Sequence, residues 1–193
     1  MLPNAIQVVL PYGHSGVQTT TSGRYTQTFR GNGLYDPDYS GVGHQPRGFD
    51  QWANLYQAYY VYKVQINIYL GNTDTNTDTA GTLFLHQNDN LTTPHFSMAD
   101  ATYSIMERMV DPKIGAKWKH FSASGAGNSQ WVFMKATYYP NTFLKDQDFE
   151  QRTAGFTADP VQQTAIHVQV KMDQTGSNRT FFLQARLFYH AIL

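Results

Sequence analysis

The stretch Gly43-His-Gln-Pro-Arg-Gly-Phe-Asp-Gln-Trp-Ala-Asn-Leu-Tyr56 decides how this chain of 193 residues is organised. Gly43, Pro46 and Gly48 mark its first part as a loop, since glycine tolerates positive φ and proline fixes φ. Asp50 is predicted to cap a short helix, because its carboxylate can accept hydrogen bonds from the free N–H groups of a first helical turn.

The spacing of apolar residues changes from helical to strand-like directly after this stretch. Five residues recur at helical spacing, which predicts one apolar helix face: Phe49, Trp52, Leu55, Tyr56 and Tyr59. Apolar residues then occupy every second position of a predicted long strand: Tyr60, Tyr62, Val64, Ile66, Ile68 and Leu70. A short helix that closes the end of a long strand is a structural device, and its pattern does not indicate a reaction centre.

Seven further strands are predicted from alternating polar and apolar residues. They span residues 5–10, 24–30, 82–86, 116–121, 131–138, 166–172 and 180–191. Pro11 and Gly13 are expected to end the first of these, with a loop over 13–23, and Asp100 is expected to cap a helix over 100–109. Eight strands, long connections and one or two short helices favour one all-β domain over residues 1–193. We expect a jelly roll of two packed four-stranded antiparallel sheets.

The composition narrows the range of functions. The chain has 14 basic and 14 acidic residues, and this balance argues against a free-standing electrostatic nucleic-acid binder. Charged residues make up 15%, against about 25% in a typical soluble domain. Aromatic residues also make up 15%, which suits sheet faces and interfaces. These values favour a protein whose surface is largely buried against other copies of itself.

Patterns typical of catalysis and of cofactor binding are missing from the sequence. The seven histidines are scattered and the chain has no cysteine, so an enzyme is not expected. His44 looks the most site-like, but we expect it to hydrogen-bond loop backbone. Asp74, Asn76 and Asp78 match the first three ligand positions of a calcium loop, but Thr79 replaces the required glycine. A solvated loop is therefore preferred to a metal site. The apolar runs are also too short to span a membrane.

Two sets of basic residues are candidates for nucleic-acid contact. Lys117 and Lys119 flank Trp118, which is able to stack on a base, and Arg24 and Arg30 share one strand face. The structural alternative is that these residues lie on outward strand faces, with Trp118 in the core.

A resemblance to a known family rests on several motifs. The stretches concerned are Leu34-Tyr-Asp-Pro-Asp38, Gly43-His-Gln-Pro46, Gly48-Phe-Asp-Gln-Trp52, Leu55-Tyr56, Gly115-Ala-Lys-Trp-Lys119 and Phe156-Thr-Ala-Asp-Pro160. They resemble the capsid proteins of circovirus-like small circular single-stranded DNA viruses. The residues that carry the central motif are Asp36, Pro37, Asp38, Gly43, His44, Gln45, Pro46, Gly48, Phe49, Asp50, Trp52, Leu55 and Tyr56.

The resemblance implies a structural protein of the virion. About 60 copies would close into a small icosahedral (T=1) shell around circular single-stranded DNA, with assembly in the host nucleus. It implies that the central motif braces the subunit, and it offers Arg24, Arg30, Lys63, Lys117 and Lys119 as candidates for the inner surface. In the family a basic N-terminal arm contacts the DNA, and here we expect that arm to be absent or trimmed. The host receptor stays open.

Two other classes of function are kept as alternatives. A carbohydrate-binding β-sandwich module or lectin would stack exposed Trp and Tyr rings on sugars. An enzyme on a cupin-like barrel would need clustered His and acidic ligands, which the sequence does not display. Because a fold does not fix a function, the residues alone leave a coat protein and a binding module near parity.

Overall fold

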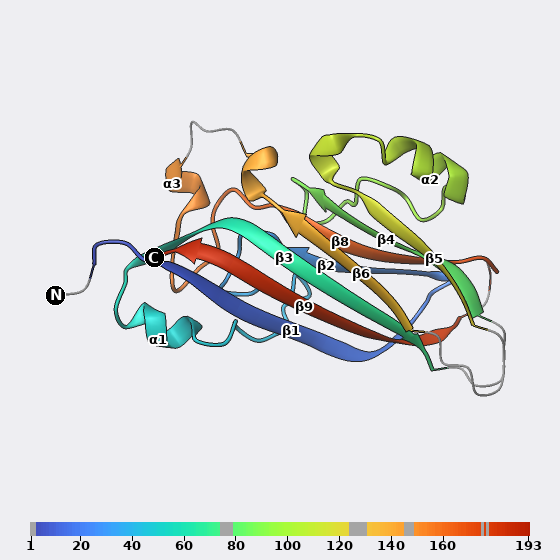
Figure 1. Ribbon diagram of the computed structural model, residues 1–193, viewed down its shortest axis with the longest axis horizontal. Helices are drawn as coiled ribbons and strands as arrows, with labels where there is room; N and C mark the ends of the chain where they lie inside the picture. Colours follow the sequence, from blue (N-terminus) through green and yellow to red (C-terminus); the bar gives the residue numbers. More distant parts are fainter. Residues whose placement is uncertain (1–2, 74–78, 124–130, 145–148, 175, 177) are drawn as a thin grey trace.

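Two antiparallel sheets pack face to face in the computed structural model, which describes residues 3–73, 79–123, 131–144, 149–174, 176 and 178–193 (Figure 1). The first sheet has the order β1-β9-β3-β6 and the second β2-β8-β4-β5, while the short β7 pairs with β3. The first sheet contains β1 (Gln7–Thr19), β3 (Ala58–Asn72), β6 (Trp131–Tyr138), β7 (Ala154–Gly155) and β9 (Thr180–Ile192). The second contains β2 (Arg24–Arg30), β4 (Thr79–Asn88), β5 (Lys117–Ala123) and β8 (Ala165–Met172). Three short α-helices lie in the connections: α1 (Phe49–Ala53), α2 (Thr102–Arg108) and α3 (Phe149–Arg152).

The strand pairing is nested, and this identifies the architecture. β1 pairs with β9, β2 with β8, β3 with β6 and β4 with β5, all antiparallel. The chain therefore folds as a double strip whose successive pairs alternate between the two sheets. This is the jelly-roll arrangement, as the strand count and long connections predicted.

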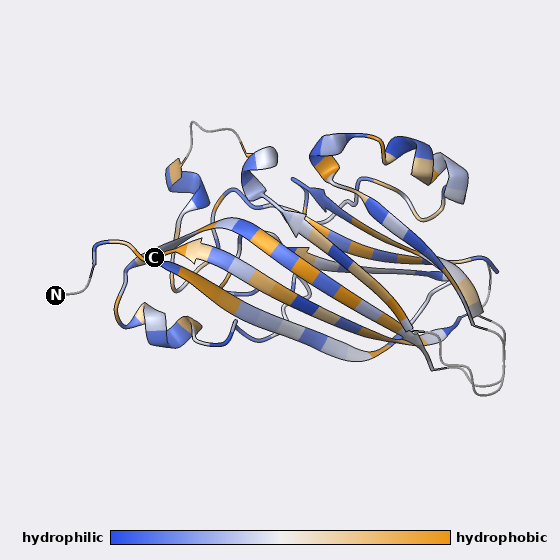
Figure 2. Ribbon diagram, viewed as in Figure 1, coloured by the Kyte–Doolittle hydropathy of each residue, from blue (hydrophilic) through white to orange (hydrophobic). Residues whose placement is uncertain are grey.

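Apolar and polar residues alternate along the strands, as the banding of the front strands in Figure 2 shows. The apolar side chains fill the space between the sheets. In β9 the inward residues Phe181, Leu183, Ala185, Leu187 and Tyr189 are all buried. Inward residues of β3 and β8 join them in one continuous core. These are the inward sets that the period-two pattern predicted, apart from the first residues of β3. There a bulge between Val61 and Lys63 buries Val61, where the sequence predicted Tyr60 and Tyr62 to share the face of Val64.

The first strand is longer than predicted. β1 continues through Pro11 and Gly13 and stays paired with β9 as far as Thr19, so the predicted end at Pro11 and the predicted loop from Gly13 are wrong. The physical reason is its place at the edge of the sheet. Proline lacks an N–H, and an edge strand needs that donor at only half of its positions.

Two predicted helix caps are also wrong. α1 begins after Gly48, whose φ of 90° lies in the left-handed region that favours glycine, and Asp50 lies inside the first turn. Leu55 is largely exposed, whereas Phe49 is buried. α2 begins after Ala101, and the carboxylate of Asp100 pairs with Arg108 instead.

Residues 89–116 cover the outer face of the second sheet. Phe84 of β4 packs with Phe96, Met98, Ile105 and Ile114 in a second apolar cluster. As a result every residue of β8 is buried, on both of its faces. The cover also supplies hydrogen-bond partners to this strand, as when Gln169 Nε2 donates to the Phe96 carbonyl at 3.3 Å.

Two buried histidines lie at the seam between this sheet and its cover. The rings of His86 and His167 are 5.1 Å apart. His167 meets the Thr28 hydroxyl at 2.9 Å and the Asn90 carbonyl at 3.0 Å, and His86 Nε2 accepts from the His95 backbone N–H at 3.3 Å. Burial lowers the pKa of His167 to about 4 and also lowers the pKa of His86.

We therefore expect the protein to lose stability as the pH falls from about 6.5 to 4. The folded state holds His167 neutral over this range while the unfolded state takes up a proton. At about 1.4 kcal/mol per pKa unit, the loss from His167 is about 3 kcal/mol. Urea unfolding at pH 7 and pH 4.5 measures it. His167→Gln should flatten this dependence, whereas His120→Gln, at a half-exposed ring, should keep the wild-type slope. Equal slopes for both variants would contradict the prediction.

Asp38 joins the long connection after β2 to both sheets. Its carboxylate accepts from Gln27 of β2 at 2.8 Å and from the Ser40 N–H and hydroxyl at 2.9 and 2.7 Å, and it pairs with His14 of β1 at 3.1 Å. Burial by itself raises the pKa of Asp38, but the hydrogen bonds from His14 and Ser40 outweigh it and lower this pKa to about 2.

We expect Asp38→Ala to lower the free energy of unfolding by about 3 kcal/mol, because it leaves the partly buried donors of His14 and Gln27 without their acceptor. Urea denaturation at pH 7 measures the change. Asp50→Ala is the matched control, since Asp50 is exposed in α1, and it should cost about 0.5 kcal/mol. A cost for Asp38→Ala no larger than that of the control would show that this network does not stabilise the fold.

Candidate nucleic-acid interface

The outward side of the β1-β9-β3-β6 sheet is uncovered, in contrast to the second sheet. In Figure 1 this sheet lies in front, and no described helix crosses it. We refer to it as the open face, and its side chains are those out of phase with the core. They are Val9, Pro11, Gly13, Ser15 and Val17 of β1, Phe182, Gln184, Arg186, Phe188 and His190 of β9, Lys63, Gln65, Asn67 and Tyr69 of β3, and Trp131, Phe133, Lys135 and Thr137 of β6.

The open face carries positive charge and no carboxylate. The strands of the two sheets, as the structure describes them, contain no Asp and no Glu. Lys63, Lys135 and Arg186 project from the open face, and no ion pair in the described part of the chain involves any of them. Burial and the charge of Lys63 lower the pKa of the neighbouring His190, so that ring stays neutral near pH 7.

The cations lie in register across the sheet. Gly13 of β1 pairs with Arg186 of β9, Arg186 with Asn67 of β3, and Asn67 with Lys135 of β6. At the edge, Lys117 and Lys119 reach across from β5 of the other sheet. Their ammonium groups donate to the carbonyls of Lys135 and Phe133 at 2.9 and 3.4 Å. The row therefore ends in a small group of amines.

Aromatic rings lie beside this row. Tyr69 and Phe133 are 4.8 Å apart between ring centroids, and the Arg186 guanidinium lies 5.5 Å from the Tyr69 ring. Trp131 and Phe182, which both pair with Gly71 of β3, have ring centroids 5.9 Å apart. A Cβ atom on Gly71 would lie 2.8 Å from the Trp131 ring, so this glycine allows the indole to rest on the sheet. Half-exposed rings beside cations suit stacking on bases and pairing with phosphates.

The residues predicted to contact nucleic acid do not all meet at one place. Lys63 lies on the open face, and Lys117 and Lys119 lie at its edge. Trp118 is half-exposed on the opposite side of β5, so the structure separates it from the two lysines that flank it in the sequence. Arg24 projects from the outer side of β2 in the second sheet.

Arg30 is committed to internal contacts. Its guanidinium pairs with Asp36 at 3.1 Å and with Asp159 at 3.3 Å, and it donates to Gln163 at 3.0 Å. Two carboxylates therefore compete with any phosphate for this side chain, and we leave it out of the interface.

The central motif lies around the start of β1 and the end of the long connection. His44 contacts the Gly13 carbonyl of β1 at 2.9 Å and the Gln45 carbonyl of its own loop at 2.7 Å. Pro37 accepts from the Arg30 N–H at 2.8 Å, and Trp52 and Tyr56 pack against the main core. Asp74, Asn76 and Asp78 lie outside the described residues. Among the residues described, no group of His, Cys, Asp or Glu is placed to hold a metal ion, and no helix is long and apolar enough to cross a membrane.

Sequence reasoning missed Lys135, Arg186, Phe133, Trp131 and Phe182. The signal was present, since each stands at an outward position of a strand that the period-two pattern located. These residues come together on one face only because of the strand order. β9 lies between β1 and β3, so residues far apart in the chain become neighbours. The pattern within one strand carries no information about that order.

Comparisons with known proteins were made at the level of sequence and of structure. No family model and no curated protein matches the chain. Similar solved structures include the decameric BFDV capsid protein, with 11% identity over 97% of this chain and 98% of that chain and a TM-score of 0.44. Turnip yellow mosaic virus (10%, 99% and 96%, TM-score 0.41) and sacbrood virus of honeybee (14%, 94% and 80%, TM-score 0.41) are also similar. These neighbours come from viral capsids, but at such values the likeness assigns no family.

Proposed function

We propose that this chain is a viral coat protein that assembles with copies of itself into a small icosahedral shell around a single-stranded DNA genome. About 60 copies would form the shell, as the resemblance of residues 34–56 implies. The open face would line the interior and contact the DNA, beside any contribution from a basic arm. The observation that carries the proposal is the asymmetry of the sandwich, in which one sheet is covered and the other carries cations and rings without carboxylates.

The surface of the chain supports self-assembly. Large apolar side chains are also exposed outside the open face: Val42, Tyr103, Val110, Tyr139 and Val161. Exposed apolar groups of this number are typical of proteins that bury their surface against partners. The low charge content of the chain acts in the same direction, because few charges need to be desolvated when copies meet.

A carbohydrate-binding module is the second candidate. The observation in its favour is the pair of neighbouring rings Tyr69 and Phe133 on an uncovered sheet, with Gln184 and Asn67 close by as polar partners. Sugars are mostly uncharged, however, and the Arg186 and Lys135 side chains between these groups favour an anionic ligand. The coat protein is therefore the better account of the open face.

The particle mass of the purified protein tests the first proposal. Light scattering after size exclusion at neutral pH, with negative-stain images of the same fractions, should show uniform round shells of megadalton mass, built from about 60 copies of a 21.9 kDa chain. A monomer or small oligomer at all salt concentrations, with or without added single-stranded DNA, would contradict it. Stabilisation by an oligosaccharide in the same fractions would favour the binding module.

The contact between the open face and DNA is tested by neutralising two cations. We expect Lys135→Gln with Arg186→Gln to weaken binding of an oligothymidylate and to reduce the slope of log affinity against log salt by about 1.4, because each phosphate contact contributes about 0.7. Fluorescence anisotropy at several salt concentrations measures both values.

The matched control combines Lys113→Gln with Arg108→Gln, which removes the same charge from the cover of the second sheet. The control should retain the wild-type slope. Equal loss of affinity in the two double variants would show that binding follows overall charge and that the open face is not the interface.

A further inference from the structure

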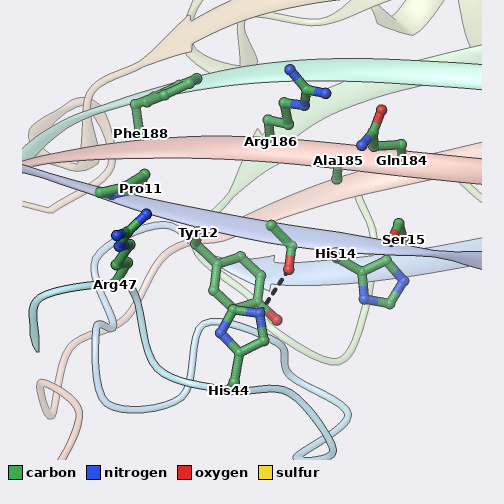
Figure 3. Close-up of a pocket in the computed structure, with 11 residues that line it drawn as sticks. Pro11, Tyr12, His14, Ser15, His44, Arg47, Gln184, Ala185, Arg186 and Phe188 are labelled. Carbon is green, nitrogen blue, oxygen red and sulfur yellow. Dashed lines mark hydrogen bonds between the residues drawn. The ribbon is translucent and has the colours of Figure 1, made fainter.

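A hollow of about 450 Å³ interrupts the open face between β1, β9 and the loop that carries His44 and Arg47 (Figure 3). The pairing of β1 with β9 creates the hollow, because smaller residues of β1 lie opposite larger residues of β9. The pairs are Pro11 with Phe188, Gly13 with Arg186 and Ser15 with Gln184. A Cβ atom built on Gly13 would meet no atom within 4 Å, so the space above this glycine is open.

The loop forms a fixed wall of the hollow. The Arg47 backbone N–H donates to the Pro11 carbonyl at 3.0 Å, and His44 Nε2 contacts the Gly13 carbonyl at 2.9 Å. The His44 ring also packs on the Tyr12 ring, with centroids 4.7 Å apart. Three contacts from the loop to one strand hold the hollow open without a ligand, which lowers the entropic cost of binding.

The lining of the hollow combines positive charge with an apolar ring. Arg47 comes from the loop and Arg186 from β9, and among the described residues neither is in an ion pair. The Arg186 guanidinium is held over Tyr69, which limits its freedom. No carboxylate lines the space, and Phe188 and Pro11 contribute apolar surface.

This lining selects a ligand with an anionic group and a flat apolar part. A guanidinium pairs with two oxygens of a phosphate through parallel hydrogen bonds, and an aromatic ring stacks on a base. The volume lies within the range of about 300 to 1,000 Å³ for small-ligand sites. We propose that the hollow binds one nucleotide of a single strand, with its phosphate on Arg47 and its base against Phe188.

This inference rests on the proposed function, since it names one discrete site on the face that would meet the genome. It adds that one nucleotide per subunit is held in a defined pocket, whereas the rest of the open face contacts the strand diffusely. A sugar, a free anion or a second copy of the chain are the competing occupants, and the experiment separates them.

The test uses the full chain and three probes: thymidine 5′-monophosphate, thymidine and inorganic phosphate. Isothermal titration at low salt should show that the nucleotide binds at least about 10-fold more tightly than either part, which corresponds to about 1.4 kcal/mol. Inorganic phosphate that binds as tightly as the nucleotide would overturn the proposal in favour of a free-anion site. Absence of nucleotide binding would also overturn it.

Two variants locate the site. Gly13→Val fills the hollow and leaves every charge in place, and Arg47→Gln removes one charge from an exposed position. Each should weaken nucleotide binding at least about 10-fold, or by about 1.4 kcal/mol. Thr19→Val on the same strand lies outside the lining and should bind as the wild type does. Unchanged affinity in both Gly13→Val and Arg47→Gln would overturn the assignment.

Particle mass is recorded for the same wild-type preparation. Shells that form but bind no nucleotide would refute the pocket and leave the coat proposal standing. Nucleotide binding by a protein that never exceeds a small oligomer would support the pocket and refute the coat proposal.

Discussion

The buried carboxylate of Asp38 is the contact on which the arrangement of the other parts depends. One oxygen meets Gln27 in the second sheet and the other meets His14 in the first, so a single side chain ties both sheets to the connection between them. That connection continues to His44 and Arg47, which form the wall of the hollow on the open face. A buried charge is expensive unless it is hydrogen-bonded, and here the partners come from three separate segments: β1, β2 and the connection itself. The position of the loop, and with it the shape of the hollow, is therefore set from inside the sandwich.

The sandwich itself was largely predictable, because a strand with one buried face must alternate. β6, β8 and β9 were located almost to the residue, and the alternation of β8 and β9 gave the correct inward sets. The prediction failed where a local signal has a meaning that depends on context. Pro11 and Gly13 usually end a strand, yet β1 passes through both since it lies at an edge. Likewise Gly48 takes the left-handed conformation that starts α1, so Asp50 is not needed as a cap.

The open face was harder to foresee, because it depends on which strands are neighbours. A net charge of zero argued against electrostatic binding of nucleic acid by the chain alone. The total does not show, however, that basic and acidic residues lie in different parts of the fold. Carboxylates lie in the connections, where Asp36 and Asp159 hold Arg30, while the strands carry only cations. Arg186 and Lys135 are 51 positions apart in the sequence, and only the order β9-β3-β6 brings them into one row. Local patterns in the sequence carry no direct record of that order.

The two outer faces of the sandwich differ in exposure to solvent, because residues 89–116 cover one sheet and no described helix covers the other. The cover of residues 89–116 removes water from His86 and His167, so that side of the protein responds to protons. The open face has no such cover (Figure 1). The predicted cost of protonating His86 and His167 acts where the second sheet meets its cover, while the row from Gly13 to Lys135 belongs to strands of the other sheet. The predicted loss of stability at low pH therefore arises on the covered side of the subunit, and the proposed ligand contacts lie on the other side.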